Sequence, residues 1–292
     1  MTEILIPVER MSRDIRAAAT TLSTRQARFL VDAYYQFQED RKRADGRIRA
    51  LSELNEPHSV INWLSEQSNT VENQIKGALD RYTGSHAIGS WMREIKGIGP
   101  VIAAGFLANL AIRRTDKEGV EHIAQVAGSF WSVCGLVPGK DRRRRGEKAN
   151  WNPALKRICW IAGESFKKLQ SSDEDAYYRH IYDERKTFEN AQNEAGAYAE
   201  QAARELTEKK FGDDTKAKTF YAAGKLPPGH IDRRAARYAV KQFLSDLHTV
   251  WYEYEMGTPP PKPYVIEHMG HVHLRVAPHV QSMQNAMRRK AA

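Results

Sequence analysis

The residues with the greatest chemical potential are lysines and arginines that gather in one stretch of the chain. Between Pro138 and Gln170 there are ten lysines and arginines against three acidic residues, whereas the whole 292-residue chain has a net charge of +9. The stretch contains Lys140, Arg142, Arg143, Arg144, Arg145, Lys148, Lys156 and Arg157. Concentrated positive charge favours a polyanion, because binding releases the counterions condensed on it. The distribution therefore predicts a surface that binds nucleic acid.

A second candidate phosphate site is the glycine turn in the segment IKGIGPVIAAGF. Two glycines allow positive φ and close backbone approach, and we expect the positive φ at Gly99. Pro100 suits the first turn of a helix, whose unpaired amides attract phosphate. The segment predicts a helix-hairpin-helix that binds the sugar-phosphate backbone through Lys96, Gly97, Gly99 and Val101. An ordinary helical hairpin with a glycine turn is the alternative.

Further cations and aromatic residues extend this pattern. Arg233, Arg237 and Lys241 recur every four residues, so they share one face of a helix and form either a second phosphate track or a solvated face. Trp131, Trp151 and Trp160 flank the basic run, and indole rings can stack on unpaired bases. We expect Trp131 and Trp160 to pack in the core and Trp151 to be the more exposed of the three.

Other groups of potential ligands or catalytic residues are weaker. His268, His271, His273 and His279 have a spacing that suits a divalent metal, but no cysteine accompanies them, so we expect solvated side chains and no metal or cofactor. Two acidic clusters, at residues 173–175 and 213–214, could in principle supply the metal ligands of a nuclease. The first lies where a helix should begin, which its carboxylates would stabilise. No catalytic residue is predicted.

The cellular setting follows from composition. Cys134 and Cys159 are too few and too far apart for a disulfide framework or a cysteine zinc site, which indicates a reducing compartment. No stretch approaches the ~20 apolar residues of a membrane-spanning helix. The first residues lack the basic leader and long apolar core of a signal peptide. We therefore predict a cytoplasmic protein without a membrane partner.

Helical periodicity dominates the chain and predicts an all-α protein. Residues 1–23 form an N-terminal arm, and residues 24–90 form two long helices that break at Pro57. Their narrow apolar seam is typical of a helical hairpin or of a coiled coil that assembles a homo-oligomer. Residues 91–257 form the helix-hairpin-helix domain, with a helical insertion at about 185–228, and residues 258–292 form an irregular tail containing proline and histidine.

Three helices are predicted within residues 91–257, after the hairpin. Asn152 and Pro153 are typical of a helix N-cap and first turn, and the helix they begin should bury Leu155, Ile158 and Phe166. Residues 173–211 predict one long polar helix. A strongly amphipathic helix follows from about Ile231 to Met256, where Gly257 ends it.

The order of four segments resembles the C-terminal domain of the bridge-RNA-guided insertion-sequence transposases. The segments are IKGIGPVIAAGFLANL, FWSVCGLVPGKDRRRRGEK, NPALKRICWIAGESF and GHIDRRAARYAVKQFL, and the resemblance spans roughly residues 91–257. It implies a glycine hairpin and a basic stretch that hold DNA, in a protein of a mobile element or phage.

The chain departs from this family at both of the family's catalytic devices. The family's first half is a RuvC-like fold whose strands carry four acidic metal ligands, whereas this chain begins with charged helices. The family's nucleophilic serine precedes a glycine of the basic stretch, and the position before Gly146 here is Arg145. An arginine cannot form the covalent phosphoserine link. We therefore predict non-catalytic DNA binding, with an active recombinase or nuclease and an RNA-binding or protein-interaction adaptor as the alternatives.

Overall fold

The computed structural model describes residues 9–56, 58–137, 146, 149–212, 215–261 and 276–291. In these ranges the protein is all-α, as predicted, and its strands β1 (Arg113–Thr115) and β2 (Glu121–Ile123) pair into one small sheet. The chain forms two compact units. Unit 1 comprises Met1–Glu94, Ile98–Glu121 and His279–Ala292, and unit 2 comprises Ile95–Gly97 and His122–Pro278.

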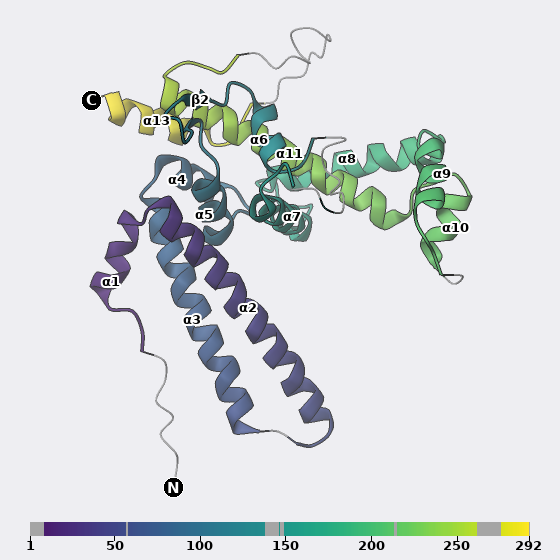
Figure 1. The fold of residues 1–292 in the computed structure, drawn as a ribbon, viewed down its shortest axis with the longest axis horizontal. Coiled ribbons are helices and arrows are strands. Elements are labelled where there is room, and N and C mark those ends of the chain that lie inside the picture. Colours follow the sequence, from purple (N-terminus) through teal and green to yellow (C-terminus); the bar gives the residue numbers. More distant parts are fainter. Residues whose placement is uncertain are drawn as a thin grey trace. The chain divides into compact units, whose positions relative to one another are not determined.

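Unit 1 is built on a long helical hairpin. The short helices α1 (Arg13–Ala18) and η1 (Ala19–Thr21) precede α2 (Thr24–Glu53), which lies against α3 (Ser59–Gly84) along its length (Figure 1). A capping box starts α2, because the Ser23 side chain accepts from the Gln26 amide and the Gln26 side chain accepts from the Ser23 amide. The prediction of two long helices is confirmed.

The seam between α2 and α3 is partly polar. Ala27, Val31 and Tyr35 are buried on α2 near its start, but farther along Arg41 donates to the buried Glu72 carboxylate over 2.7 Å. Burial alone would raise the pKa of Glu72, yet hydrogen bonds from Arg41 and Gln38 lower it. A polar seam of this kind fixes the register of the two helices.

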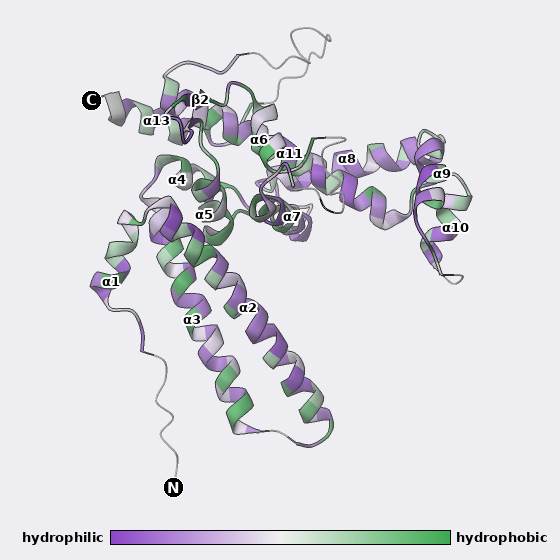
Figure 2. Cartoon of the chain, viewed as in Figure 1, coloured by the Kyte–Doolittle hydropathy of each residue, from purple (hydrophilic) through white to green (hydrophobic). Residues whose placement is uncertain are grey.

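The core of unit 1 surrounds α5 (Pro100–Asn109), which follows α4 (Ala87–Glu94). Residues 100–108 of α5 are all buried, and the helix is apolar on every side (Figure 2), which is typical of a central helix. Arg28 of α2 caps its C-terminus by donating to the Ala108 carbonyl over 2.7 Å. The predicted irregular tail contains α13 (Val280–Ala291), which packs on α4, so that part of the prediction is wrong.

Unit 2 is organised around the long helix α11 (Pro228–Met256). Helices α6 (Ala127–Val133), α7 (Pro153–Lys168) and α8 (Tyr177–Glu194) pack against it. As predicted, Asn152 caps α7 by accepting from the Ala154 amide over 2.9 Å, and the glycine at position 257, with φ +72°, ends α11. The predicted apolar face of α7 is buried, with Phe166 stacked on Tyr178 of α8.

The single polar helix predicted over residues 173–211 is wrong. The chain forms α8, then a turn with Gly196 at φ +79°, then α9 (Ala199–Glu208) and α10 (Lys216–Ala222). This break lets α9 and α10 close a small core of their own against the start of α11, built on Ala202, Tyr221, Leu226 and Ile231. A glycine in the left-handed region stops a helix even where the flanking composition favours one.

Candidate nucleic-acid groove

The predicted hairpin has its helices where expected but a different turn. Gly99 has φ −77° and ψ 170°, so the expectation of a positive φ there is wrong, and Gly97 holds the positive φ, at +93°. Two effects favour an extended backbone at Gly99. It is the residue before a proline, Pro100, and it is the N-cap of α5, a position that usually has extended dihedral angles. A methyl group at Gly99 would meet nothing within 4 Å, whereas one at Gly97 would lie 2.9 Å from the Phe166 ring.

The hairpin residues predicted to bind phosphate differ in availability. Lys96 is exposed, but its amino group lies 2.7 Å from the Asp173 carboxylate and 3.1 Å from that of Asp175. This acidic cluster therefore neutralises the charge of a lysine predicted to bind phosphate. Val101 is buried, while Gly97 and Gly99 are half-buried. A phosphate at the hairpin would have to compete with the two carboxylates.

The arginine run lies largely outside the described residues. Lys140, Arg142, Arg143, Arg144, Arg145 and Lys148 all do so, and only Gly146 of that segment is described. The chain on either side of the run is held together. The Asn152 amide donates to the Val133 carbonyl over 2.8 Å, and Trp151 packs so closely on Gly135 that a Cβ there would lie 2.8 Å from its ring. Both ends of the basic segment are therefore anchored between α6 and α7.

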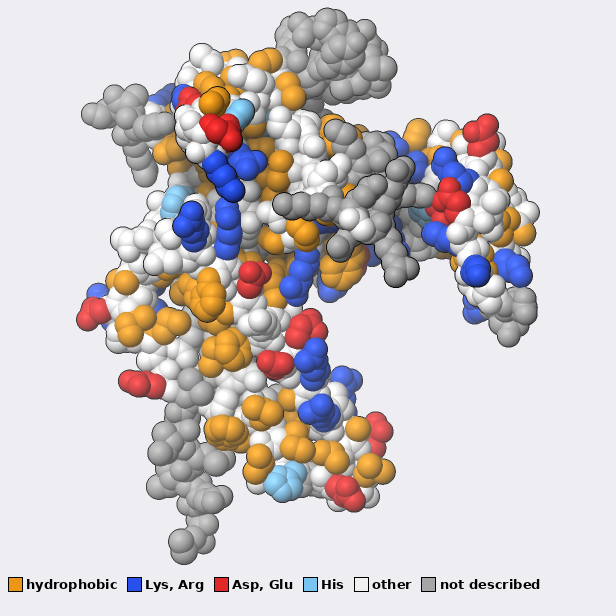
Figure 3. Space-filling model, in the orientation of Figure 1, with side chains coloured by type: hydrophobic (Ala, Val, Ile, Leu, Met, Phe, Trp, Pro, Cys, Tyr) orange, Lys and Arg blue, Asp and Glu red, His pale blue; other side chains and the backbone are white. Residues whose placement is uncertain are grey.

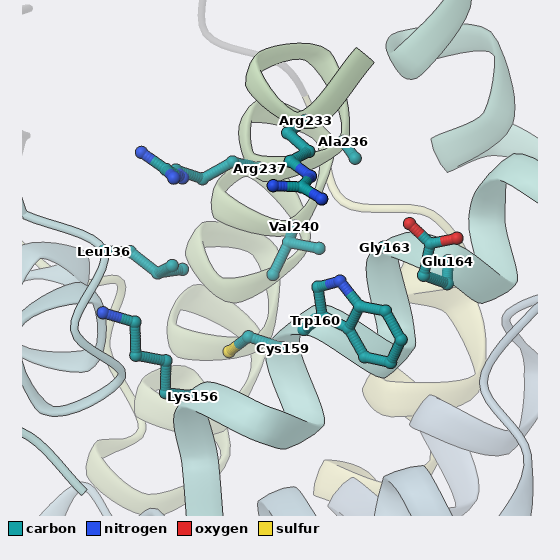
Figure 4. A pocket seen from close by; sticks show the side chains of 10 residues that line it. All are labelled: Leu136, Lys156, Cys159, Trp160, Gly163, Glu164, Arg233, Ala236, Arg237 and Val240. Carbon is teal, nitrogen blue, oxygen red and sulfur yellow. The ribbon is translucent and has the colours of Figure 1, made fainter. Parts of the chain in front are cut away.

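Beside these anchored ends, α7 and α11 enclose an open groove of about 130 Å³, called here the α7–α11 groove (Figure 4). Three of the predicted nucleic-acid-binding cations, Lys156, Arg233 and Arg237, line it. The other lining residues are Leu136, Cys159, Trp160, Gly163, Glu164, Ala236 and Val240. Cations that are about 80 residues apart in the chain thus share one concave surface.

The two helices can form this groove because small residues meet at its base. A Cβ at Gly163 would lie 3.3 Å from the Val240 side chain and 3.5 Å from that of Ala236. The groove-lining residues of each helix are three to four positions apart, so their side chains project from the same face of that helix toward the groove. In Figure 4, Lys156 and Arg237 lie toward the end marked by Leu136, and Arg233 points toward the side where Trp160 lies.

The groove has a positive charge because its nearby carboxylates already have lysine partners. Glu164 accepts from Lys167 over 3.0 Å, and Lys167 also lies 2.6 Å from Asp232. Burial alone would raise the pKa of Asp232, but hydrogen bonds from Lys167, Tyr182 and Lys186 lower it to about 2. Both arginines of the groove, Arg233 and Arg237, are exposed.

The three tryptophans are placed differently from the prediction. Trp160 is 63% exposed, so the expectation that it packs in the core is wrong. Trp151 is half-buried under Gly135, with the Lys156 amino group 4.2 Å from its ring centre, so it is not the most exposed of the three. Trp131 is half-buried and donates to the Lys241 carbonyl over 3.1 Å. Trp160 is the aromatic side chain that the groove presents to solvent.

Two further cations predicted to bind nucleic acid, Lys241 and Arg157, are not among the residues that line the groove. The Lys241 amino group lies 4.0 Å from the centre of the Trp131 ring, and its pKa is lowered by burial and by the charges of Arg237 and Arg185. Lys241 is half-buried, whereas Arg233 and Arg237 on the preceding turns are exposed. Arg157 is exposed on α7 next to Lys156.

The two cysteines, distant in sequence, meet in unit 2. Both are buried and form no disulfide. Burial, and then the neighbouring Cys134, raises the pKa of the Cys159 thiol well above its usual value. Cys159 therefore contributes a neutral apolar floor to the groove.

The sequence does not predict the exposure of Trp160 or the pairing of α7 with α11. A usable signal was present, because Lys156, Trp160 and Glu164 recur every four residues as Arg233 and Arg237 do. The amphipathic pattern of α7 marks Ile158, Ala162 and Phe166 as its buried face, which leaves Trp160 on the opposite side.

Two further properties concern metals and membranes. Three of the four tail histidines, His268, His271 and His273, lie outside the described residues, and His279 lies 3.8 Å from the Glu94 carboxylate. Among the described residues, no three histidine, cysteine or acidic side chains gather as metal ligands would. None of the helices in those same ranges is both long and apolar enough to cross a membrane.

Comparison with known proteins gives no relative for this chain: no family model, curated protein or solved structure matches it.

Proposed function

We propose that this protein binds DNA without cleaving it, and that the α7–α11 groove holds the sugar-phosphate backbone. The observation that carries the proposal is the convergence of Lys156, Arg233 and Arg237 on one groove from two distant segments. Guanidinium groups form bidentate hydrogen bonds with phosphate, so two exposed arginines one helical turn apart suit neighbouring phosphates.

Two observations extend the binding surface beyond the groove. The arginine run at residues 142–145 is joined at both ends to the segments that flank the groove, so its four charges can add to the same electrostatic attraction. The resemblance to the C-terminal domain of bridge-RNA-guided transposases supports DNA as the polyanion and a mobile element or phage as the source. Arg145 at the position of the family's serine supports binding without strand exchange.

The double variant Arg233→Ala/Arg237→Ala tests the proposal. We expect its affinity for a blunt DNA duplex to fall at least about tenfold, because two charge-assisted phosphate contacts are lost. The slope of log affinity against log salt should become shallower by about 1.8, since each phosphate contact contributes about 0.9. The measurement is fluorescence anisotropy of a labelled duplex at several salt concentrations.

A matched control removes the same charge elsewhere in unit 2. Arg204 and Lys216 are exposed on α9 and α10, so Arg204→Ala/Lys216→Ala should leave the affinity and the salt slope nearly unchanged. Equal losses in both double variants would mean that only net charge matters, which would contradict the groove as the binding site. Tighter binding to a structured RNA of equal length would favour an RNA-binding protein. Nicking of the duplex in magnesium would favour a nuclease or recombinase.

We also propose that the protein self-associates through the tip of the α2–α3 hairpin. Leu54, Val60 and Leu64 are each at least half exposed there, and Figure 3 shows apolar side chains gathered near this end of the hairpin. Exposed charges of both signs surround the tip, namely Arg47, Arg49, Glu53, Glu56 and Glu66. A two-fold interface needs a self-complementary surface, and an apolar patch with mixed charges at its rim meets that need.

Replacing Val60 and Leu64 with glutamate should convert the associated protein into a monomer, because the apolar contact would then bury unpaired charge. Sedimentation equilibrium measures the change. Phe29→Glu is the control, since Phe29 is at least as exposed as Val60 and Leu64 but lies near the start of α2, away from the tip. A wild-type protein that stays monomeric at every concentration would rule out this interface.

A further inference from the structure

The composition of the α7–α11 groove differs from that of a surface that touches phosphates alone. A duplex presents its phosphates on the outside, and a protein that binds only these needs cations and amides. This groove instead combines the cations with an apolar floor of Cys159 and Val240, both buried, and with the exposed indole of Trp160. The 63% exposed indole of Trp160 leaves an aromatic face on which a planar group can stack.

We infer that the α7–α11 groove takes an unpaired nucleotide, with the base stacked on Trp160 and the flanking phosphates bound by Arg233 and Arg237. This inference rests on the proposed function and names the form of nucleic acid that the groove takes. In a duplex each base face is covered by the next base pair, and only base edges are accessible. In a single strand the faces are exposed, and aromatic side chains stack on them regardless of sequence.

The positions of the side chains support stacking. Trp160 and Lys156 lie one turn apart on α7, and Arg233 and Arg237 lie one turn apart on α11. In Figure 4, Arg233 extends from α11 toward the Trp160 ring, while Arg237 and Lys156 lie toward the Leu136 end of the groove. The groove of about 130 Å³ is below the usual range of about 300–1,000 Å³ for pockets that enclose a drug-sized ligand. It is a shallow site that holds one flat ring with its backbone running along the opening.

The test compares a labelled oligothymidylate with a blunt duplex of equal length, using Trp160→Ala and Trp160→Phe. We expect Trp160→Ala to weaken binding of the single strand by about 5- to 150-fold, which corresponds to a stacking contribution of ~1–3 kcal/mol. Binding of the duplex should change less than about twofold. Trp160→Phe should retain most of the single-strand affinity, because a phenyl ring also stacks. The salt slope should not change in either variant, since no charge is removed.

Phe220→Ala is the control, because Phe220 is an exposed aromatic residue of α10, in the same unit but outside the groove. Quenching of tryptophan fluorescence by the oligothymidylate should be lost selectively in Trp160→Ala. Unchanged single-strand affinity in Trp160→Ala would overturn the inference, while the proposed function would stand if Arg233→Ala/Arg237→Ala still weakened duplex binding. If neither variant altered any affinity, the proposed function would fail as well.

Discussion

Replacing Gly89 with alanine should destabilise unit 1 by about 3 kcal/mol or more, because the added methyl group has no space. Gly89 lies buried in α4, and a Cβ there would be 2.2 Å from the carbonyl oxygen of Thr83 and 2.9 Å from its carbonyl carbon. These are backbone atoms at the end of α3, and the helix itself holds them in place. The Thr83 side chain adds to this restraint, because it is fully buried and its hydroxyl donates to the Leu79 carbonyl. The connection between α3 and α4 would therefore have to move as a whole.

Gly77→Ala is the matched control within the same unit. Gly77 is exposed in the middle of α3, and a Cβ there would meet nothing within 4 Å. Alanine should stabilise this position by about 0.5–1 kcal/mol, since glycine carries an entropic cost inside a helix. Thermal unfolding followed by circular dichroism measures the loss of stability expected for Gly89→Ala and the gain expected for Gly77→Ala. Amide hydrogen exchange in α3–α5 locates the change. Equal melting temperatures for Gly89→Ala and wild type would contradict the close packing of α4 on α3.

The features that the sequence predicted are those determined by neighbouring residues. Helical periodicity identified α2, α3, α7 and α11, because an apolar face repeats within each helix and needs no partner to be recognised. The Asn152 cap and the end of α11 at Gly257 are also local, since each depends on one residue and the amides or carbonyls next to it.

The features that the sequence did not predict depend on contacts between distant segments. The positive φ expected at Gly99 is found at Gly97 instead, because Pro100 favours an extended conformation at the residue before it. Trp160 is exposed, although tryptophan is on average a highly buried residue. The α7–α11 groove itself requires the pairing of residues near 160 with residues near 236, and nothing in either segment alone specifies that pairing.

Replacing Glu189 with glutamine should destabilise unit 2 by about 3 kcal/mol, because it breaks a buried ionic network. The Glu189 side chain is 2% exposed and accepts from Arg185 over 2.7 Å, from Arg234 over 2.7 Å and from the Tyr198 hydroxyl over 2.5 Å. It therefore connects α8 to α11 and to the start of α9. Glutamine keeps the size of the side chain but leaves two mostly buried guanidinium groups without an anion. The melting temperature should fall by roughly 6–12 °C, at about 2–4 °C per kcal/mol.

The pH dependence separates this ionic effect from a simple packing defect. Burial alone would raise the pKa of Glu189, but hydrogen bonds from Tyr198, Arg234 and Arg185 lower it below its ordinary value of 4.5. A lowered pKa gives stability that is present above pH 4.5 and is lost as the pH falls through the folded-state pKa, so the difference between wild type and Glu189→Gln should shrink in acid. Glu194→Gln on the same helix is the control, since Glu194 is 69% exposed and its pair with Lys225 should contribute little. A difference between wild type and Glu189→Gln that stayed constant from neutral pH into acid would show that lost packing, rather than lost charge, explains the destabilisation.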